Sequence, residues 1–573
     1  MHKQKKPNFL KGAAILAATG VFAKIIGAIY QIPILSVLGD EGAGYFHVTY
    51  TVYGLLLAIS TAGVPVALSR LVSSAAARGN TALVQRYYSV AMPAFIVIGI
   101  VFMCIMFFFA DSLAGFMSSS LAATGIRVLA PAVFFVCIIS VFRGYAQGYQ
   151  DMIPTAASQV IEVVSKSVIG LIVAFYLSRI GYQSQYVSAG AIMGVTIGLG
   201  LCIPVMMWYK RRIDRRNLDL DSVETNTSNI IPSESDSTES ISSEGDPSES
   251  GSAELPSRKR VLSQFLKVSI AISLSASFMS IMGVIDTSVV SNRLQSALML
   301  TESEAMAQLG IFRKGLSLYN LPPSLVVPLA VSIIPAIAAA VARKSKDEAS
   351  NIMQSSIKLT NLFAMPACAG IMVLAGPILK ALYFDPGQSP ETVVTMNLIL
   401  TILGAASYFV CLQHMTIATL QANGFERIAL MTFPAGAVVR IALSYFLVAN
   451  PNIGILGSPF ATLACFAVIV TLNIIFITIK VKARFKVVSG FIKPLGCALI
   501  MSALTFLTYE GVYKLGSEFL GTGVNAVRLY LAISIIVGVV VYVSLVILTR
   551  AITKEDLSLV PKGEKLAKLL RVR

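Results

Sequence analysis

The feature that most constrains this chain is a series of apolar stretches, each of the ~20 residues needed to cross a bilayer as a helix, that recurs from residue 12 almost to residue 550. A lipid-exposed backbone must satisfy its own hydrogen bonds, which favours helices. We therefore expect an all-α polytopic membrane protein with about 14 transmembrane helices. The expected spans are 12–38, 46–69, 88–110, 121–145, 154–178, 186–208, 264–290, 313–340, 355–379, 393–418, 428–449, 454–479, 490–509 and 528–549.

The composition excludes a soluble protein. Of the 573 residues, 55% are hydrophobic and 13% charged, with mean hydropathy +0.76, whereas soluble chains carry roughly 25% charged residues. The apolar runs leave no room for an extramembrane enzyme. The net charge of +16 does not indicate nucleic-acid binding, because the basic residues lie in short clusters between apolar runs, as topology signals do. Their distribution places both termini in the cytoplasm.

Neither a cofactor nor a metal site is expected. The seven cysteines all fall inside apolar segments without a C-x-x-C motif, so they are interpreted as small packing residues. The three histidines are scattered along the chain and form no metal-ligand pattern.

A change of composition divides the chain. Between Arg216 and Arg258 there is no Lys or Arg, while residues 217–257 hold ten Asp or Glu and a dozen Ser. This predicts a disordered cytoplasmic linker over 216–260, either a solvated spacer or a partner-binding segment. It separates an N-terminal lobe (1–215) from a C-terminal lobe (261–487), followed by two extra helices (488–550) and a basic cytoplasmic tail (551–573).

The two lobes look like repeats of each other. An ungapped offset of 274 residues aligns Phe135-Val136-Cys137 with Phe409-Val410-Cys411, and Lys166 with Arg440. The matched residues lie in the fourth and fifth spans of each half. Internal repeats of this kind are typical of transporters whose substrate site lies at the repeat interface near the midplane.

Charged residues inside the spans need an explanation, since each costs about 2.5–3.5 kcal/mol at the bilayer centre. Lys24 either faces a cavity or extends to the interface. Gln159, Glu162 and Lys166 share one helix face, so Glu162 and Lys166 form either a structural pair or part of a polar path. Arg440 has no carboxylate within a turn on its own helix.

Further charges lie nearer the span ends. Asp286 is expected to act either as a counter-ion of an intramembrane cation or as an ion-coupling ligand. Lys358 is explained by extension to the cytoplasmic interface. Arg313 and Lys314 begin the eighth span, where they either cap a pathway or anchor the helix. Because positive charge exceeds negative charge inside the spans, an anionic substrate is favoured over a cationic one.

Small residues and prolines mark packing and bending positions. Gly194-x-x-x-Gly198 predicts close helix packing. Proline removes a helix hydrogen bond, so the eighth span is a plausible bending element. It carries Pro322, Pro323, Pro328 and Pro335.

Three motifs carry a resemblance to a known family. They are Thr61-Ala-Gly-Val-Pro-Val-Ala-Leu-Ser-Arg70-Leu-Val-Ser, Arg143-Gly-Tyr-Ala-Gln147-Gly-Tyr-Gln and Pro154-Thr-Ala-Ala-Ser-Gln159-Val-Ile-Glu162. The sequence resembles the polysaccharide-biosynthesis branch of the multidrug, oligosaccharidyl-lipid and polysaccharide (MOP) exporter superfamily. It is most similar to Gram-positive MurJ-type lipid II flippases, with stage V sporulation protein B as near kin.

The resemblance implies two six-helix lobes around a central cationic cavity, with the last two helices forming a groove for a polyprenyl tail. Lys24 matches the first-helix cation of the family. The family's Gram-positive members carry similar residues at the positions of Glu162, Lys166, Asp286 and Arg440. The expected substrate-binding residues are accordingly Lys24, Glu162, Lys166, Lys314 and Arg440.

The sequence also departs from the family. A second basic position on the first helix is occupied by Tyr30 and Gln31. The usual cation of the eighth helix is replaced by Ser317, and Lys314, one turn earlier, is the expected substitute.

The implied function is translocation of lipid II, an undecaprenyl-pyrophosphate-linked peptidoglycan precursor, across the bacterial cytoplasmic membrane by alternating access, in support of cell-wall synthesis and cell shape. An exporter of another lipid-linked oligosaccharide and a cation-coupled multidrug antiporter are the alternatives. The expected partners are the lipid-linked saccharide and membrane lipids, with cell-wall synthesis proteins as candidates, and the chain is expected to be a monomer.

Overall fold

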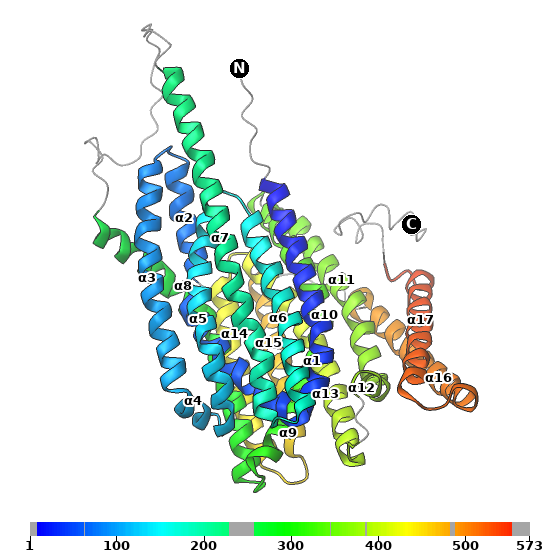
Figure 1. The fold of residues 1–573 in the computed structure, drawn as a ribbon. Helices are drawn as coiled ribbons and strands as arrows, with labels where there is room; N and C mark the ends of the chain where they lie inside the picture. The colour runs from blue at the N-terminus through cyan, green and yellow to red at the C-terminus, as the bar shows by residue number, and fades with distance from the viewer. Residues whose placement is uncertain are drawn as a thin grey trace.

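The all-α prediction is confirmed. The computed structural model describes residues 9–61, 63–228, 257–343, 345–383, 387–481 and 488–552, and within these ranges every regular element is a helix (Figure 1). Eleven helices of the described ranges are long and apolar enough to cross a membrane, so the chain is a multi-pass membrane protein. The expected number of fourteen transmembrane helices stays a prediction.

The first half of the chain forms one bundle, the N-lobe. The first two expected spans are separated by a kink in α1, where Gly39 adopts non-helical dihedral angles with a positive φ of 68°. A residue with a Cβ adopts such a conformation at a cost, which explains a glycine at this bend. The helices of the N-lobe are α1 (Phe9–Thr61), α2 (Val64–Ala76), α3 (Thr81–Phe108), α4 (Ala110–Phe116), α5 (Ala123–Gly148), α6 (Ile153–Ile180) and α7 (Ser184–Ser228).

The second half begins with α8 (Arg258–Ser296), which packs against α1, α2 and α3 as well as α14. The expected span 313–340 is two helices interrupted at Asn320, two residues before Pro322. The remaining helices are α9 (Glu302–Tyr319), α10 (Leu321–Ala342), α11 (Lys346–Val373), α12 (Ala375–Tyr383), α13 (Pro390–Ala422), α14 (Glu426–Val448), α15 (Gly457–Phe476), α16 (Lys493–Leu520) and α17 (Val524–Leu548).

Helix α9 begins at a capping box. The Thr301 hydroxyl accepts from the Glu304 backbone N–H, and the Glu304 carboxylate accepts from the Thr301 backbone N–H at 2.8 Å. Hydrogen bonds to the ionised form hold the pKa of Glu304 below its ordinary value. The cap fixes where α9 starts and therefore which of its residues face the N-lobe.

The segment expected as a linker is described only at its two ends. Helix α7 continues to Ser228 and α8 begins at Arg258, so both ends of the expected 216–260 segment are helical. Residues 229–256 lie outside the described residues, as do residues 553–573 of the expected tail.

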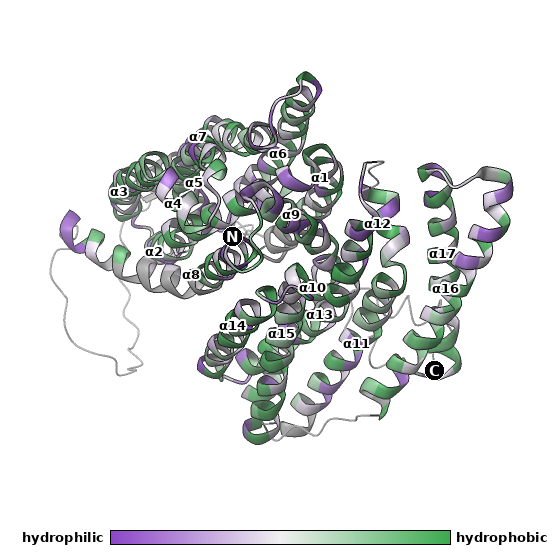
Figure 2. Ribbon diagram, turned by 90° about the horizontal axis from the view of Figure 1, so that it is seen from below, coloured by the Kyte–Doolittle hydropathy of each residue, from purple (hydrophilic) through white to green (hydrophobic). Residues whose placement is uncertain are grey.

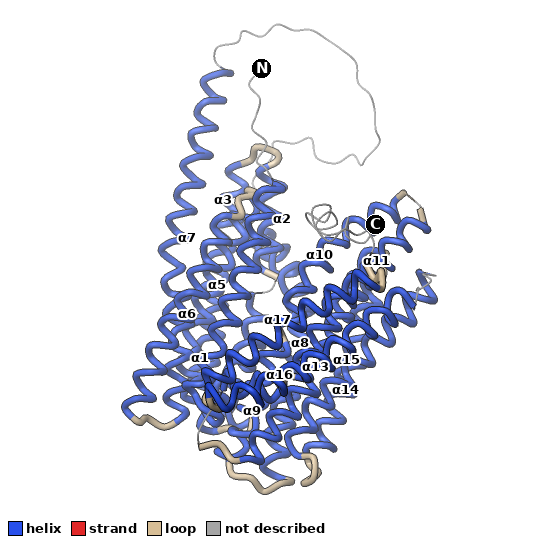
Figure 3. Tube along the Cα trace, turned by 90° about the vertical axis from the view of Figure 1, so that its right-hand side faces the viewer, coloured by secondary structure: helices blue, strands red, loops and turns tan. Residues whose placement is uncertain are grey.

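The two lobes meet at one end of the molecule and diverge toward the other (Figure 3). We call the end where α1 begins and α17 ends the terminal face, and the opposite end, where α1 is kinked at Gly39, the far face. The core is built from fully buried large side chains including Tyr45, Leu35 and Ile126. The α16–α17 pair stands beside α11 and α12 at the edge of the molecule (Figure 2), with Ile536 and Val540 of α17 exposed as in a lipid-facing helix.

Candidate functional site

The candidate site lies between the lobes, where charged side chains of α6, α8, α9 and α14 converge on the second half of α1. Lys166 of α6 is within electrostatic range of Glu162 and of Arg313 on α9. His47 of α1 is within range of both Arg313 and Arg440 of α14. The site therefore brings cations from both lobes together.

Arg440 is neutralised by a residue of another helix. Its guanidinium Nη2 lies 2.7 Å from Asp286 Oδ2, and the Ser444 hydroxyl donates to Asp286 Oδ1 at 2.9 Å. The Asp286 side chain is only 5% exposed, so this ion pair is largely removed from solvent. Asp286 is thus ion-paired with one of the intramembrane cations, while its role in transport stays a prediction.

Glu162 is paired with a residue that the helical spacing did not suggest. Arg143 of α5 lies with Nη2 3.1 Å from Glu162 Oε2 and donates from Nε to the Ser158 hydroxyl at 2.8 Å. No ion pair joins Glu162 to Lys166, although both side chains are described. The expected pair along the helix is thus replaced by one across helices, because Arg143 approaches the carboxylate from the neighbouring α5.

Lys166 is held by close packing and not by a carboxylate. Its Nζ lies 6.0 Å from the centroid of the Tyr30 ring, near enough for a cation–π interaction. Behind it α6 and α7 are in backbone contact, since a Cβ on Gly194 would lie 2.4 Å from the Gly170 nitrogen. The close packing predicted for Gly194-x-x-x-Gly198 is confirmed, and it fixes the position of Lys166 relative to α7.

The adjacent residues Arg313 and Lys314, of which Lys314 is the expected substitute for the missing cation, have different neighbours. Lys314 is buried and its ammonium donates to Asp40 of α1, whose other carboxylate oxygen accepts from Gln388 Nε2 at 3.0 Å. Lys314 is therefore engaged in a contact between the lobes. Arg313 is turned by one helical step toward the site; its Nε is buried without a hydrogen-bond partner, and no described carboxylate forms an ion pair with it.

The other predicted positions are also located. Lys24 lies in α1, but its side chain is outside the described part of the structure. Ser317, at the position of the missing cation, shares a 2.8 Å hydrogen bond with the Tyr383 hydroxyl. In the described ranges no group of three or more His, Cys, Asp or Glu side chains could hold a metal ion.

The site is closed at the far face by backbone contact between the lobes. A Cβ on Gly310 of α9 would lie 1.6 Å from the Asp40 carbonyl oxygen, and one on Gly44 of α1 would lie 2.0 Å from that of Met306. Glu41 also accepts a hydrogen bond from the Ser303 hydroxyl at 2.8 Å. Toward the terminal face the lobes separate (Figure 3).

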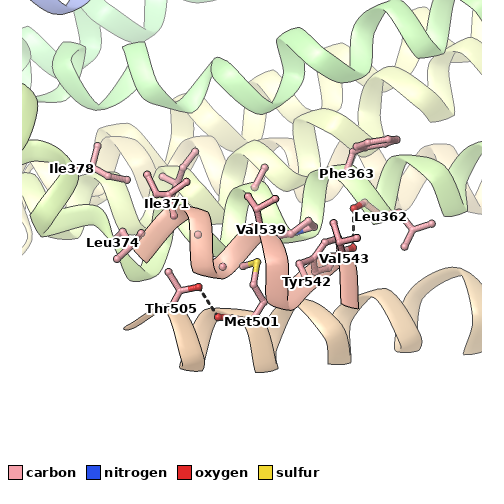
Figure 4. Close-up of a pocket in the computed structure, with 15 residues that line it drawn as sticks. Leu362, Phe363, Ile371, Leu374, Ile378, Met501, Thr505, Val539, Tyr542 and Val543 are labelled. Carbon is pink, nitrogen blue, oxygen red and sulfur yellow. Dashed lines mark hydrogen bonds between the residues drawn. The ribbon is translucent and has the colours of Figure 1, made fainter. Parts of the chain in front are cut away.

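An apolar groove of about 430 Å³ lies between α11 and the α16–α17 pair (Figure 4). Its few polar groups are satisfied within the protein: Tyr542 donates to the Leu362 carbonyl at 2.8 Å and Thr505 to the Met501 carbonyl at 2.7 Å. The groove therefore presents hydrocarbon to an occupant. Its wall includes Phe363, Ile371, Leu374, Ile378, Val539 and Val543.

Comparisons with known proteins agree with this architecture. Residues 9–228 match the family model described as "Polysaccharide biosynthesis protein". The resemblance to the polysaccharide-biosynthesis branch is thereby confirmed.

Three similar proteins cover most of the chain at low identity. Uncharacterized membrane protein YabM of Bacillus subtilis is 25% identical over 98% of this chain and 97% of its own length. Stage V sporulation protein B of the same organism is 24% identical over 97% of this chain and 98% of its own length. The Bacillus subtilis lipid II flippase MurJ is 24% identical over 76% of this chain and 77% of its own length.

Solved structures show the same fold. The inward closed conformation of lipid II flippase MurJ superposes with a TM-score of 0.66 at 15% identity, covering 94% of this chain and 99% of that one. An inward-facing MATE family transporter of the MOP superfamily gives 0.62 at 17% identity, covering 80% and 95%. The proteins with this fold are described as a flippase and a transporter, and the relative MurJ is described as a lipid II flippase.

Proposed function

We propose that the chain is a flippase that moves an undecaprenyl-pyrophosphate-linked saccharide, first of all lipid II, from the inner to the outer leaflet. The observation that carries this proposal is the pair formed by Lys166 and Arg313, two cations at the lobe interface without an ion-pair partner among the described carboxylates. Charge-assisted hydrogen bonds from such groups suit a pyrophosphate. Lys24 stays in the proposed binding set on the strength of the resemblance.

The same structure suggests a transport state. Exposed basic residues gather at the terminal face, on α2, α7 and the start of α8, so we place that face in the cytoplasm. In this orientation the two lobes diverge toward the cytoplasm (Figure 3) and are in contact on the outer side through α1 and α9. Alternating access would reverse this arrangement by moving one lobe against the other. The basic residues are Arg70, Arg78, Arg211, Arg212, Arg258, Lys259 and Arg260.

The apolar groove suits the lipid part of the substrate. A polyprenyl tail needs a hydrocarbon surface next to the membrane, and the groove between α11 and α17 supplies one within the volume range of ligand sites. The tail would stay in the groove while the pyrophosphate passes between the lobes.

No chemical step is needed for this transport. Moving a negative charge toward a positive exterior is favoured by about 2.3 kcal/mol per charge per 100 mV of membrane potential. Asp286 is engaged with Arg440 and Ser444, which favours a structural role over binding of a coupling cation.

A second candidate substrate is another lipid-linked oligosaccharide. YabM and stage V sporulation protein B align over nearly the whole chain, whereas MurJ of the same organism aligns over 76% of it. Complementation of cells depleted of their lipid II flippase separates the two candidates, because only a lipid II transporter restores growth.

The proposal is tested in proteoliposomes that contain lipid II and carry an imposed membrane potential. Lys166→Gln and Arg313→Gln should each lower transport about tenfold or more, since each removes one charge-assisted interaction. The matched control is Arg179→Gln, a change at an exposed arginine of the same helix α6. Wild-type rates in both site variants would overturn the proposal.

A further inference from the structure

The apolar groove ends at the far face in a cluster of tyrosines and cations. Ile378 lines the groove and also packs against a small core that includes Tyr509, Tyr513 and Tyr530. The groove and this cluster are therefore continuous along α12, α16 and α17.

The tyrosines form an ordered stack. The rings of Tyr509 and Tyr513 lie 5.9 Å apart with an interplanar angle of 25°, and Tyr530 meets Tyr513 edge-on at 6.0 Å. Tyr530 is buried and donates its hydroxyl hydrogen to the Gly521 carbonyl at 3.1 Å. The tyrosine stack at the end of the groove is therefore tied to the turn between α16 and α17.

Two cations flank the stack. Lys380 Nζ of α12 lies 6.0 Å from the Tyr513 ring centroid. Arg528 of α17 donates from Nε to the Ala381 carbonyl at 2.9 Å and from Nη1 to Asn525 at 3.4 Å, which sets the guanidinium next to the last turn of α12. Neither cation forms an ion pair with a described carboxylate, although Glu510 is near Tyr509.

We propose that Lys380 and Arg528 bind the phosphate of a polyprenyl lipid whose tail occupies the groove, at the end of the groove opposite the cytoplasm. The inference rests on the proposed function for the tail in the groove. A tail that stays there places the phosphate, once transport is complete, at the outer end of the groove. This is where the two unpaired cations lie, and a cation next to an aromatic face is well suited to an anionic headgroup at a membrane interface.

This phosphate site is distinct from the site between the lobes. The central site is lined by α1, α6 and α9, whereas the second is built from α12, α16 and α17. Its role is to receive the headgroup after release from the central cations, so that the lipid leaves along α17. If the cluster served only to anchor the helices at the interface, it would not discriminate between a phosphate and an alcohol.

The test measures binding to the full chain by native mass spectrometry, in a Lys166→Gln/Arg313→Gln background that silences the central site. The probes are undecaprenyl phosphate, undecaprenol and phosphatidylglycerol. We expect the background protein to prefer undecaprenyl phosphate over undecaprenol about tenfold, and Lys380→Gln/Arg528→Gln to abolish this preference. Lys514→Gln, at an exposed lysine of α16 beside the stack, is the control and should retain it.

The variant Arg528→Lys separates a role in phosphate binding from a structural role of Arg528, because it keeps the positive charge and loses the guanidinium hydrogen-bond donors. This variant should retain the preference for undecaprenyl phosphate. If the background protein binds undecaprenyl phosphate and undecaprenol equally well, the inference is overturned and the proposed function is left intact. The same holds if it binds phosphatidylglycerol as well as undecaprenyl phosphate. Transport that persists in the background variant overturns the proposed function, while a phosphate preference measured there still supports the second site.

Discussion

Arg313 and Lys314 are adjacent in α9, yet only Lys314 has an acidic partner among the described residues, because one helical step of about 100° directs the two side chains to different neighbours. Lys314 is engaged with Asp40 and ties the lobes together at the far face. Arg313 forms no ion pair with a described carboxylate, and we propose that it binds an anion between the lobes.

This division predicts opposite results for the Lys314 and Arg313 variants. Lys314→Gln should destabilise the protein by about 2 kcal/mol, because it leaves the mostly buried Asp40 carboxylate without its cation. Arg313→Gln should leave stability near wild type and weaken lipid II binding about tenfold. Thermal unfolding and a binding titration on each purified variant give both quantities.

The double variant Asp40→Asn/Lys314→Gln provides the control, since it removes both charges. Its stability should return most of the way to wild type. A double variant as unstable as Lys314→Gln alone would show that the ion pair itself is not the cause.

The Arg143–Glu162 pair predicts that Glu162→Gln tightens binding of an anionic lipid. Removing the carboxylate leaves Arg143 as an additional cation without its ion-pair partner. We expect severalfold higher affinity for lipid II and slower release, measured as equilibrium binding and turnover in proteoliposomes.

The double variant Glu162→Gln/Arg143→Gln decides which cation is released. It should bind with wild-type affinity if Arg143 is the freed group. If the higher affinity persists in the double variant, the freed cation is Lys166, as the spacing along α6 first suggested.

The buried ion pair Asp286–Arg440 and the exposed ion pair Asp111–Arg127 are expected to contribute unequally to the free energy of unfolding. Asp286→Asn leaves Arg440 without its counter-ion in a buried setting and should cost about 3 kcal/mol of unfolding free energy. Asp111→Asn breaks the exposed pair with Arg127, where the side chains are 70% and 41% exposed, and should cost less than about 1 kcal/mol. Denaturation of the two variants in the same detergent makes the comparison, and equal losses would contradict it.

The close approach of α1 and α9 predicts that Gly310→Ala opens the far face. The added methyl group would meet the Asp40 carbonyl, a backbone atom that cannot move aside alone. Cysteines introduced by Glu41→Cys and Ser303→Cys, whose side chains are in contact across the lobes, should then crosslink less efficiently. Gly283→Ala is the control, because a Cβ added there would have nothing within 4 Å; an unchanged crosslinking yield in Gly310→Ala would refute the prediction.

Much of the fold was predictable from the sequence because its signals are local. Apolar runs of bilayer length specify helices, since the backbone in lipid has no other way to satisfy its hydrogen bonds. Gly194 and Gly198 predicted close helix packing, because only glycine at that spacing lets two backbones approach. The kink of α1 at Gly39 lies between the first two expected spans, 12–38 and 46–69, where Asp40 and Glu41 interrupt the apolar run. The break of the eighth span at Asn320 was not located, since an apolar run continues through it.

The pairing of charges was decided by tertiary structure alone. Helical periodicity relates residues on one helix, and it suggested Glu162 with Lys166, whereas the ion pairs of the site join α5 to α6, α8 to α14 and α1 to α9. Ion pairing requires an approach of a few ångströms, which depends on how helices pack and rotate against each other. The sequence by itself therefore determined that cations would lie inside the membrane. Only the packed lobes decided that Asp286, Glu162 and Asp40 would neutralise Arg440, Arg143 and Lys314, and that Lys166 and Arg313 would have no ion-pair partner among the described carboxylates.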